Sequence, residues 1–566
     1  MTALLALGLT PYFACWLSGY GFACPWQPDV NYYIQLAAQP YYSHALYLSD
    51  PMIPGGATFY PWLQYIPFVC LTRFLDLSIF WIQILWTIAA ATGTGLTLYL
   101  FLWLVFRNRW LAAAITICVW ADIDLGVSYF AHRFLFVHQT YMVASDLAAH
   151  LRGQSALLRP LFPFQWRLTN AALDLPFLFL QLLVTSIARE HPSRRNLVLS
   201  GLVFALTFYA YFFLWTMIAA GLCLAAIVDR PGRSTYAWTL GLGVALGWPQ
   251  IAHDYLMKNA LSAEGVKHFW LLAAPIHAAS LSKDSPYYHP YVVIAAAVIL
   301  GVYAIRRGHP ALLLAWCMGC AGLCLSLADA TTGVFTHSYH WSWLSVPLMH
   351  IVMVAMAVDV VMLWKPKLHI SNPVGALIVS AYLVSGIYLT ASIILPGFGN
   401  YADRKTIYSE YVHQRFIPGV TPLNPGSVIA GDPFFVDLAS PAERQRPLAG
   451  VYLEVNMALD NEERRIRFVL DQYLSGIDHD QLAALLSSDY SVSITREQVP
   501  IYLHTFDEIS RDSDRFVDSL KVRYLVLPAA QRAPAVLSNR WNLIQPGPYW
   551  QIWERTETSA KNKPFS

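Results

Sequence analysis

The sequence predicts a membrane all-α bundle of about 11 transmembrane helices followed by a small extracytoplasmic α/β domain. Of the 566 residues, 56% are hydrophobic and only 13% are charged, whereas a typical soluble domain has about 25% charged residues. The charge is uneven, because 39 of the 72 Asp, Glu, Lys and Arg residues follow position 396. We therefore expect an apolar bundle over residues 1–396 and a polar domain over residues 397–566.

Apolar segments define the predicted helices, since a helix needs about 20 apolar residues to cross a bilayer. Nine segments come close to this length, at residues 2–19, 77–106, 110–130, 170–188, 235–252, 289–305, 310–328, 343–364 and 373–396. The first has neither a basic stretch before it nor a clear cleavage site. This favours a retained helix over a removed signal peptide.

Two further stretches need separate interpretation. Residues 197–228 are too long for one span and carry six aromatic side chains near their middle, among them Tyr209 and Trp215. We predict a two-helix hairpin that turns at the membrane interface. Residues 59–75 are short and interrupted by Pro61 and Pro67, which suits an interfacial helix better than a span.

Basic residues give the bundle a direction. With these spans, every short basic connection falls on one side, which the positive-inside rule assigns to the cytoplasm. The basic residues concerned are Arg107, Arg109, Arg189, Arg194, Arg195, Arg230, Arg233, Arg306, Arg307, Lys365 and Lys367. The chain is then expected in the cell inner (cytoplasmic) membrane, with its polar domain outside. The net charge of +2 gives no reason to expect a nucleic-acid partner.

Most acidic residues of the bundle fall on the outer side. The acids in outer loops or at outer helix ends are Asp29, Asp50, Asp76, Asp122, Asp124, Asp146, Asp174, Asp254, Glu264, Asp284 and Asp329. Two outer loops are large, at residues 20–76 and 130–169. A transporter is expected to carry charges near the bilayer midplane, on broken helices repeated in two halves. The sequence has neither pattern, so we expect the outer face to be the working face.

Asp29 is the first acid after the first predicted span. Two interpretations of this residue remain open. It could cap a short helix that begins PDVNYY, because Asp is a common N-cap residue. It could also act as a general base that takes the proton of an acceptor hydroxyl.

Three stretches of the sequence carry a family resemblance. They are Asp29 with Tyr32 and Tyr33, YLSDP at 47–51 leading to FYPWL at 59–63, and GLVFALTFYAYFFLW at 201–215. In these features the chain resembles the GT-C class of glycosyltransferases, integral membrane enzymes that use polyprenyl-phosphate-linked sugars. The resemblance implies that Asp29 is the catalytic base of an inverting transferase. Several subfamilies carry two acids here, whereas this chain has Val30 after Asp29.

Positive charge is needed to stabilise the leaving lipid phosphate. The second outer loop supplies Arg133 and Arg159, and His337 and His340 precede the span at 343–364. Snorkelling of the arginines to lipid headgroups and an aromatic-belt role of the histidine segment are the alternative interpretations. The residues that we assign to the donor and acceptor pocket are Tyr32, Tyr33 and Asp50.

Asp122 and Asp124 form a DxD pattern near the outer end of the third span. Two carboxylates in apolar surroundings point to a Mg²⁺ or Mn²⁺ site. On a helix, residues two apart project about 200° from each other, so both reach one ion only if the helix has already ended. Cys317 and Cys320 imitate a redox motif, but within an apolar helix we interpret them as packing residues.

The tail alternates strand-like and helical patterns. We predict strands at 427–431, 499–503 and 522–528, helices near 461–487 and 509–520, and an apolar end at 548–554. It holds no phosphate loop, nucleophile elbow or metal-ligand spacing. A structural or acceptor-handling role is therefore expected of it.

These observations together predict a membrane glycosyltransferase. Its donor would be a polyprenyl-phosphate-linked sugar, and its acceptor a cell-envelope glycan, lipid or protein. The tail lacks the WWD motif of oligosaccharyltransferases, which argues against transfer of whole glycans to asparagine. The alternatives are a lipid or glycan transporter, which needs a polar path through the bundle, and a surface-polysaccharide polymerase or ligase.

Overall fold

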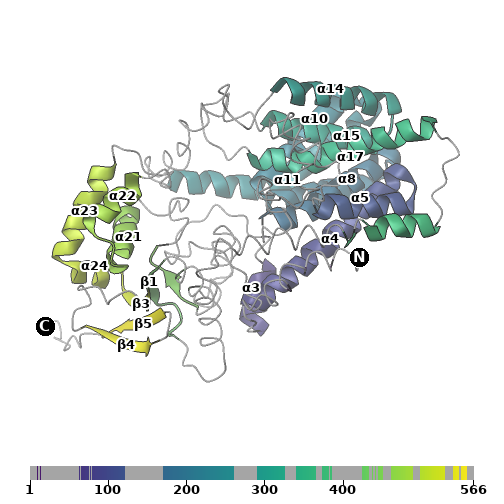
Figure 1. Ribbon diagram of the computed structural model, residues 1–566. Helices are drawn as coiled ribbons and strands as arrows, with labels where there is room; N and C mark the ends of the chain where they lie inside the picture. The colour runs from purple at the N-terminus through teal and green to yellow at the C-terminus, as the bar shows by residue number, and fades with distance from the viewer. Residues whose placement is uncertain are drawn as a thin grey trace.

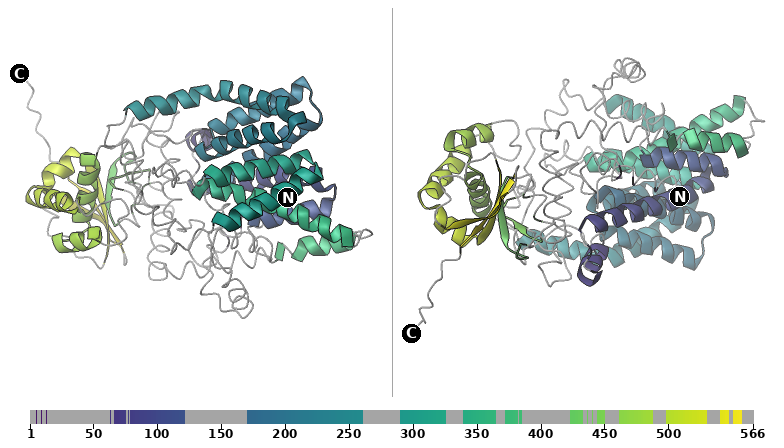
Figure 2. Two further views of the ribbon diagram at one scale, coloured as in Figure 1. Left: turned by 90° about the horizontal axis from the view of Figure 1, so that it is seen from above. Right: turned by 60° about the horizontal axis from the view of Figure 1, so that its bottom comes forward.

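The computed structural model describes a helical bundle and a smaller unit with a sheet (Figures 1 and 2). The residues described are 5, 9, 13, 63, 66–75, 77, 79–121, 170–260, 290–325, 339–364, 372–381, 383–384, 423–432, 436, 440, 444–449, 461–487, 498–529, 540–546 and 550–556. Each of the two parts has its own buried apolar cluster. The boundary at residues 396 and 397 lies outside the described residues and stays a prediction.

The helices of the bundle coincide with the predicted apolar segments. Their bounds are α3 (Ile66–Leu75), α4 (Ile79–Phe106), α5 (Arg109–Ala121), α8 (Asn170–Glu190), α9 (Arg194–Phe208), α10 (Phe212–Val228), η4 (Arg230–Gly232), α11 (Arg233–Ala260), α14 (Pro290–Arg307), α15 (Pro310–Leu325), α17 (Tyr339–Trp364) and a last helix, Asn372–Ala381. Helix α3 has 10 residues, which is too short for a span. This length agrees with the prediction for residues 59–75.

Two helices of the described chain are long and apolar enough to cross a membrane by themselves, at Ile84–Phe106 and Pro347–Trp364. A third candidate is the pair of α10 and α11, which is bent by 119° at the break between them. The predicted count of about 11 spans is not confirmed, since it also depends on residues outside the described ranges. Large apolar side chains such as Ile294, Val298 and Ile305 face outward on α14, as expected of a helix in contact with lipid.

Helices α9, α10 and α11 form the predicted hairpin and its continuation. The chain breaks between α9 and α10 at Tyr209 to Tyr211, within the aromatic cluster. Helices α9 and α11 run parallel, because Ser200 meets Thr239 at one level and Gly247 meets Phe208 at a level farther along both helices. Helix α10, which joins the end of α9 to the start of α11, therefore runs in the opposite direction.

The described basic clusters meet at one end of the bundle. Arg189 at the end of α8 pairs with Asp229 between α10 and α11, and Arg109 at the start of α5 donates to the side-chain oxygen of Asn372. His309, between α14 and α15, lies beside Glu190 at the end of α8 and Arg107 at the end of α4. The charge pattern read from the sequence thus corresponds to one physical end of the molecule, which we call the basic end.

Two clusters of the same composition, Arg–Asp–Tyr, tie helices together at the basic end. In the first, Arg189 Nε donates to Asp229 Oδ2 over 2.7 Å, and Tyr236 Oη donates to the same oxygen over 2.8 Å. Burial by itself raises the pKa of Asp229, but the hydrogen bonds from Arg189 and Tyr236 outweigh it and hold the pKa below its usual value. In the second, Tyr303 and Arg307 of α14 contact Asp359 of α17 at 2.7 and 3.1 Å.

The smaller unit contains a five-stranded sheet with the order β2-β1-β3-β5-β4. The strands are β1 (Val428–Gly431), β2 (Arg446–Pro447), β3 (Val522–Pro528), β4 (Trp541–Pro546) and β5 (Trp550–Arg555). Strands β2, β1 and β3 are parallel, and β5 and β4 continue the sheet in antiparallel pairing. The helices are α21 (Asn461–Leu474), α22 (His479–Ser487), α23 (Val499–Arg511) and α24 (Ser513–Ser519), and Figure 2 shows them together on one side of the sheet.

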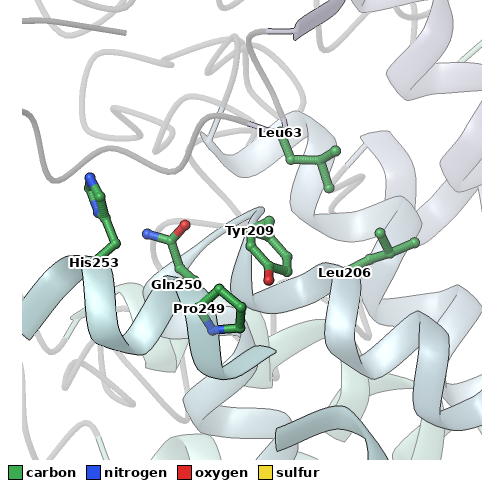
Figure 3. A pocket seen from close by; sticks show the side chains of 6 residues that line it. All are labelled: Leu63, Leu206, Tyr209, Pro249, Gln250 and His253. Carbon is green, nitrogen blue, oxygen red and sulfur yellow. The ribbon is translucent and has the colours of Figure 1, made fainter. Parts of the chain in front are cut away.

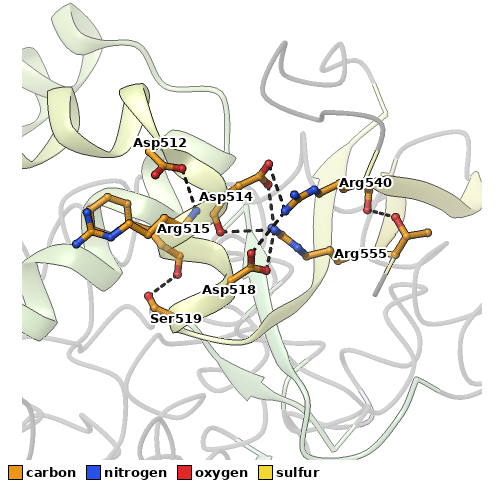
Figure 4. A network of polar contacts seen from close by, with 9 residues as sticks. Asp512, Asp514, Arg515, Asp518, Ser519, Arg540 and Arg555 are labelled. Carbon is orange, nitrogen blue, oxygen red and sulfur yellow. Dashed lines mark hydrogen bonds and ion pairs between the residues drawn. The ribbon is translucent and has the colours of Figure 1, made fainter. Parts of the chain in front are cut away.

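Ion pairs connect α24 to the last two strands. Arg555 Nη2 of β5 lies 3.0 Å from Asp514 Oδ1 and 2.8 Å from Asp518 Oδ1. Arg540, just before β4, contacts the same two carboxylates (Figure 4). Two arginines between two aspartates balance the charge, so we assign this cluster a structural role.

Two predictions for the tail were wrong in detail. Residues 499–503, predicted as a strand, begin helix α23, because Pro500 suits the first turn of a helix and Thr505, Phe506 and Ile509 continue a buried helical face. The predicted helix at 461–487 is two helices. Gly476 has φ +76° and its N–H donates to the carbonyl of Tyr473, which ends α21 in a Schellman motif. The strands at 427–431 and 522–528 are confirmed.

Candidate functional site

A pocket of about 440 Å³ lies at the end of the bundle opposite the basic end. It is lined by Leu63, Leu206, Tyr209, Pro249, Gln250 and His253 (Figure 3). The residues come from three separate places in the sequence: the segment before α3, the end of α9 with the turn after it, and the second half of α11. The aliphatic side chains and the proline ring give the pocket an apolar wall, and Tyr209, Gln250 and His253 supply its polar atoms.

Hydrogen bonds of Tyr209 fix the walls of the pocket. Its carbonyl accepts the N–H of Leu63 at 3.2 Å, so the segment that leads into α3 is attached to the hairpin turn. Its hydroxyl donates to the carbonyl of Leu246 on α11 over 2.9 Å. Pro249 lies one turn farther along α11, where the missing proline N–H interrupts the helical hydrogen bonds. Three segments distant in sequence are thereby held around one space.

The polar edge of the pocket lies on one stretch of α11. Gln250 Nε2 donates to Asp254 Oδ1 over 2.7 Å, and His253 Nδ1 lies 3.3 Å from the same oxygen. Gln250 is buried, whereas His253 is largely exposed. The amide and the imidazole that line the pocket therefore share one carboxylate, Asp254. They can accept or donate protons and hydrogen bonds, and the carboxylate orients the imidazole.

An aromatic cluster supports the hairpin turn beside the pocket. The rings of Phe208 and Trp215 stack with centroids 4.5 Å apart. Phe213 packs edge-on against Trp341 of α17 at 5.0 Å, and Trp341 Nε1 donates to Thr216 Oγ1 over 2.8 Å. These contacts hold the beginning of α17 against the beginning of α10. The backbone of His340, next to Trp341, therefore lies at the same end of the bundle as the pocket.

Most site residues predicted from the sequence lie outside the described residues. These are Asp29, Tyr32, Tyr33, Asp50, Asp122, Asp124, Arg133, Arg159 and His337. His340 belongs to α17, but its side chain is not described. The catalytic, phosphate-binding and metal-binding roles assigned to these residues stay predictions.

Within the described ranges, no group of three or more His, Cys, Asp and Glu side chains is placed to hold a metal ion. The predicted pair Asp122 and Asp124 lies beyond them. Cys317, one half of the CxxC pattern, is fully buried among apolar residues of α15. This burial agrees with the packing role expected for it.

A chain of buried polar side chains crosses the interface of α8, α9 and α11. Gln181 Nε2 donates to Thr185 Oγ1 at 2.7 Å, Thr185 Oγ1 contacts Ser200 Oγ at 2.8 Å, and Ser200 Oγ contacts Thr239 Oγ1 at 2.9 Å. All four residues are fully buried. Sequence reasoning missed this chain, because uncharged polar residues spaced along apolar helices give no charge signal. Three helices are thus joined in the bundle interior by hydrogen bonds that lipid could not replace.

Sequence reasoning also missed Gln250 and His253. Asp254 was recognised as an outer acid, and one further signal was available: Pro249 is followed by three polar residues within five positions, at the end of an apolar segment. A proline near the outer end of a predicted span, followed by Gln, His and Asp, is typical of a helix that leaves the apolar layer.

Comparison with known proteins gives matches among solved structures alone, since no protein-family model and no curated protein matches the chain. The archaeal oligosaccharyltransferase AglB from Archaeoglobus fulgidus, in complex with an inhibitory peptide and a dolichol-phosphate, matches with 11% identity and a TM-score of 0.39, over 93% of this chain and 69% of that chain. The Archaeoglobus fulgidus oligosaccharyltransferase in complex with Zn and sulfate matches with 13% identity and a TM-score of 0.37, over 93% and 68%. The same enzyme tethered to an acceptor peptide containing the NVT sequon matches with 11% identity and a TM-score of 0.36, over 93% and 69%.

Proposed function

We propose that this chain is a membrane glycosyltransferase. It moves a sugar from a polyprenyl-phosphate-linked donor to a cell-envelope glycan, lipid or protein acceptor. The observation that carries the proposal is the pocket at the outer end of α9 and α11, where an apolar wall meets a polar edge. A lipid-linked sugar has the same two parts, an apolar chain and a polar head.

The direction of the bundle supports an outward-facing site. The basic end contains the arginine clusters of α4, α8, α10 and α14, and the positive-inside rule assigns such an end to the cytoplasm. With this orientation the pocket opens toward the outer leaflet. Helix α11 extends from the bundle toward the sheet-containing unit (Figures 1 and 2). We place this unit outside the membrane, as a periplasmic domain.

The proposed mechanism uses residues of both large outer loops and two histidines at positions 337 and 340. Asp29 accepts the proton of the acceptor hydroxyl as this oxygen attacks the anomeric carbon, which inverts its configuration. The bond from that carbon to the lipid phosphate breaks, and Arg133, Arg159, His337 and His340 stabilise the phosphate that leaves. A general base contributes about 10²- to 10⁴-fold to such a rate. Tyr32, Tyr33 and Asp50 would contact the sugar and the acceptor.

A divalent cation is part of the proposal. Asp122 and Asp124 would bind Mg²⁺ or Mn²⁺, which prefer carboxylate oxygens. When bound, the ion would neutralise the charge of the donor phosphate.

The experiment that tests the proposal compares the wild-type chain with Asp29→Asn and Leu206→Trp in proteoliposomes that contain a polyprenyl-phosphate-linked sugar. Asp29→Asn should abolish transfer while the melting temperature stays unchanged. Leu206→Trp, which fills the pocket, should raise the KM for the donor and leave kcat nearly intact. Full activity of the Asp29→Asn protein would remove the proposed base, and an unchanged donor KM in the Leu206→Trp protein would remove the pocket from the donor path.

Transport of a lipid or glycan is the second candidate, and one observation favours it. The buried chain from Gln181 to Thr239 places polar groups inside the bundle, which is the feature that a transporter requires. Gln181→Leu separates the two functions. A transporter would lose substrate movement across the membrane in this variant and keep it in Asp29→Asn, whereas a transferase would show the opposite pattern. Polymerase or ligase activity differs from single transfer in its product, which is a chain of repeating units.

A further inference from the structure

Four arginines with exposed side chains gather where α9, α10 and α11 meet at the basic end. Arg194 and Arg195 begin α9, Arg230 lies in η4, and Arg233 begins α11. Arg194 and Arg233 lie at the same level of the bundle. Helices α9 and α11 run parallel with Ser200 opposite Thr239, and each of these two residues follows its arginine by six positions. We call Arg194, Arg195, Arg230 and Arg233 the arginine cluster.

The positive charge of the arginine cluster is not neutralised by Asp229, the acid that precedes Arg230. Asp229 is already bonded to Arg189 and Tyr236. Among the described residues, no ion pair involves Arg194, Arg195 or Arg230. Arg233 uses its Nε to donate to the carbonyl of Ala226 over 2.9 Å, which fixes the stem of this side chain and leaves its two terminal nitrogens available.

Exposed apolar side chains lie within five residues of the cluster on the same three helices. Ile227 at the end of α10 is 69% exposed, Trp238 on α11 is 64% exposed, and Leu199 of α9 is also exposed. Trp238 follows Arg233 by five residues, which corresponds to about 7.5 Å along a helix. Tryptophan is enriched at the boundary between the headgroups and the hydrocarbon core of a bilayer. The arginines therefore lie at the level of the lipid phosphates when these apolar faces contact acyl chains.

We infer that the arginine cluster binds the headgroups of anionic phospholipids in the leaflet at the basic end. The acyl chains of the bound lipid pack against Ile227, Leu199 and Trp238, and its phosphate accepts hydrogen bonds from the guanidinium groups. The site takes a lipid rather than a free anion, since the apolar faces adjoin the charges. It is independent of the transferase reaction, because it lies at the end of the bundle opposite the pocket.

The test measures binding of phosphatidylglycerol to the purified full-length chain in a zwitterionic lipid nanodisc, by native mass spectrometry. Arg230→Gln should weaken binding about fivefold, and the triple variant of Arg194, Arg195 and Arg230 to Gln should weaken it about 100-fold, because each basic residue near an anionic surface contributes about 1 kcal/mol. The matched control is Arg306→Gln, which removes one exposed arginine of α14 at the same end. It should leave the affinity unchanged.

Three results would overturn the inference. Equal losses in Arg230→Gln and Arg306→Gln would show attraction by total charge instead of a site. Full retention of the lipid by the triple variant would remove the cluster from binding. Displacement of the lipid by inorganic phosphate at the same concentration would identify a site for free anions. All four substitutions are at exposed positions, so circular dichroism of the helices should be identical to the wild type.

Discussion

The ion pair of Arg189 and Asp229 offers the sharpest test of how the bundle is held at its basic end. We predict that Asp229→Asn destabilises the protein much more than Asp359→Asn. Both substitutions keep the shape of the side chain and remove the negative charge of an Arg–Asp–Tyr cluster. They differ in burial, because the side chain of Asp229 is 8% exposed and that of Asp359 is 35% exposed.

The magnitude follows from this difference in burial. Arg189 forms two hydrogen bonds with Asp229, from Nε at 2.7 Å and from Nη2 at 3.1 Å, and its side chain is 21% exposed. Removing one partner of a fully buried pair costs about 3–5 kcal/mol. Because Arg189 retains some water, we expect about 2–3 kcal/mol for Asp229→Asn. Asp359→Asn, in the more exposed pair with Arg307, should cost about 1 kcal/mol or less.

The assay is thermal unfolding of the detergent-solubilised chain, followed by circular dichroism. Asp229→Asn should lower the melting temperature by about 4–8 °C, and Asp359→Asn by about 2 °C. A double variant, Arg189→Met with Asp229→Leu, serves as the control, since replacing both charges with apolar groups removes the unpaired charge. It should recover most of the lost stability.

Two results would refute this reasoning. If Asp229→Asn and Asp359→Asn lower the melting temperature equally, burial does not determine the strength of these clusters. If the double variant is as unstable as Asp229→Asn, the loss comes from shape and not from an uncompensated charge.

Further predictions concern pH and backbone geometry. The pKa of Asp229 is lowered in the folded state, so this group stabilises the protein at pH values above its unfolded pKa of about 3.9. The stabilisation disappears as the pH falls through the folded pKa. The difference in melting temperature between the wild type and Asp229→Asn should therefore disappear in acid. Gly243→Ala places a methyl group against the ring of Phe204 and should cost about 1–3 kcal/mol of stability. At Gly241 an added methyl group meets nothing within 4 Å, so Gly241→Ala should be neutral or slightly stabilising. Equal melting temperatures of these two variants would contradict the packing of α9 on α11. Gly476→Ala, at φ +76°, should cost about 1 kcal/mol in urea unfolding of the full chain, and an unchanged midpoint would show that this turn tolerates a side chain.

Hydropathy and charge by themselves predict where several helices of the bundle lie and which end is basic. The apolar segments at 77–106 and 343–364 predicted α4 and α17, and the aromatic cluster predicted the break between α9 and α10. The arginine pattern predicted a basic end. The ion pair of Arg189 with Asp229 and the position of His309 beside Glu190 and Arg107 agree with it. These features are local, because the length of a span and the charge of a loop do not depend on which helices are neighbours.

The sequence alone did not decide short elements or distant pairings. Residues 499–503 could be a strand or the first turn of a helix, and the buried face that continues through Phe506 and Ile509 made them helical. The pocket joins Leu63, Tyr209 and Pro249, and the polar chain joins Gln181, Ser200 and Thr239. Each depends on the parallel register of α9 and α11, which is set by the fit of glycines against Phe204 and Phe208. Such a fit is a property of two packed surfaces, so only the tertiary structure reveals it.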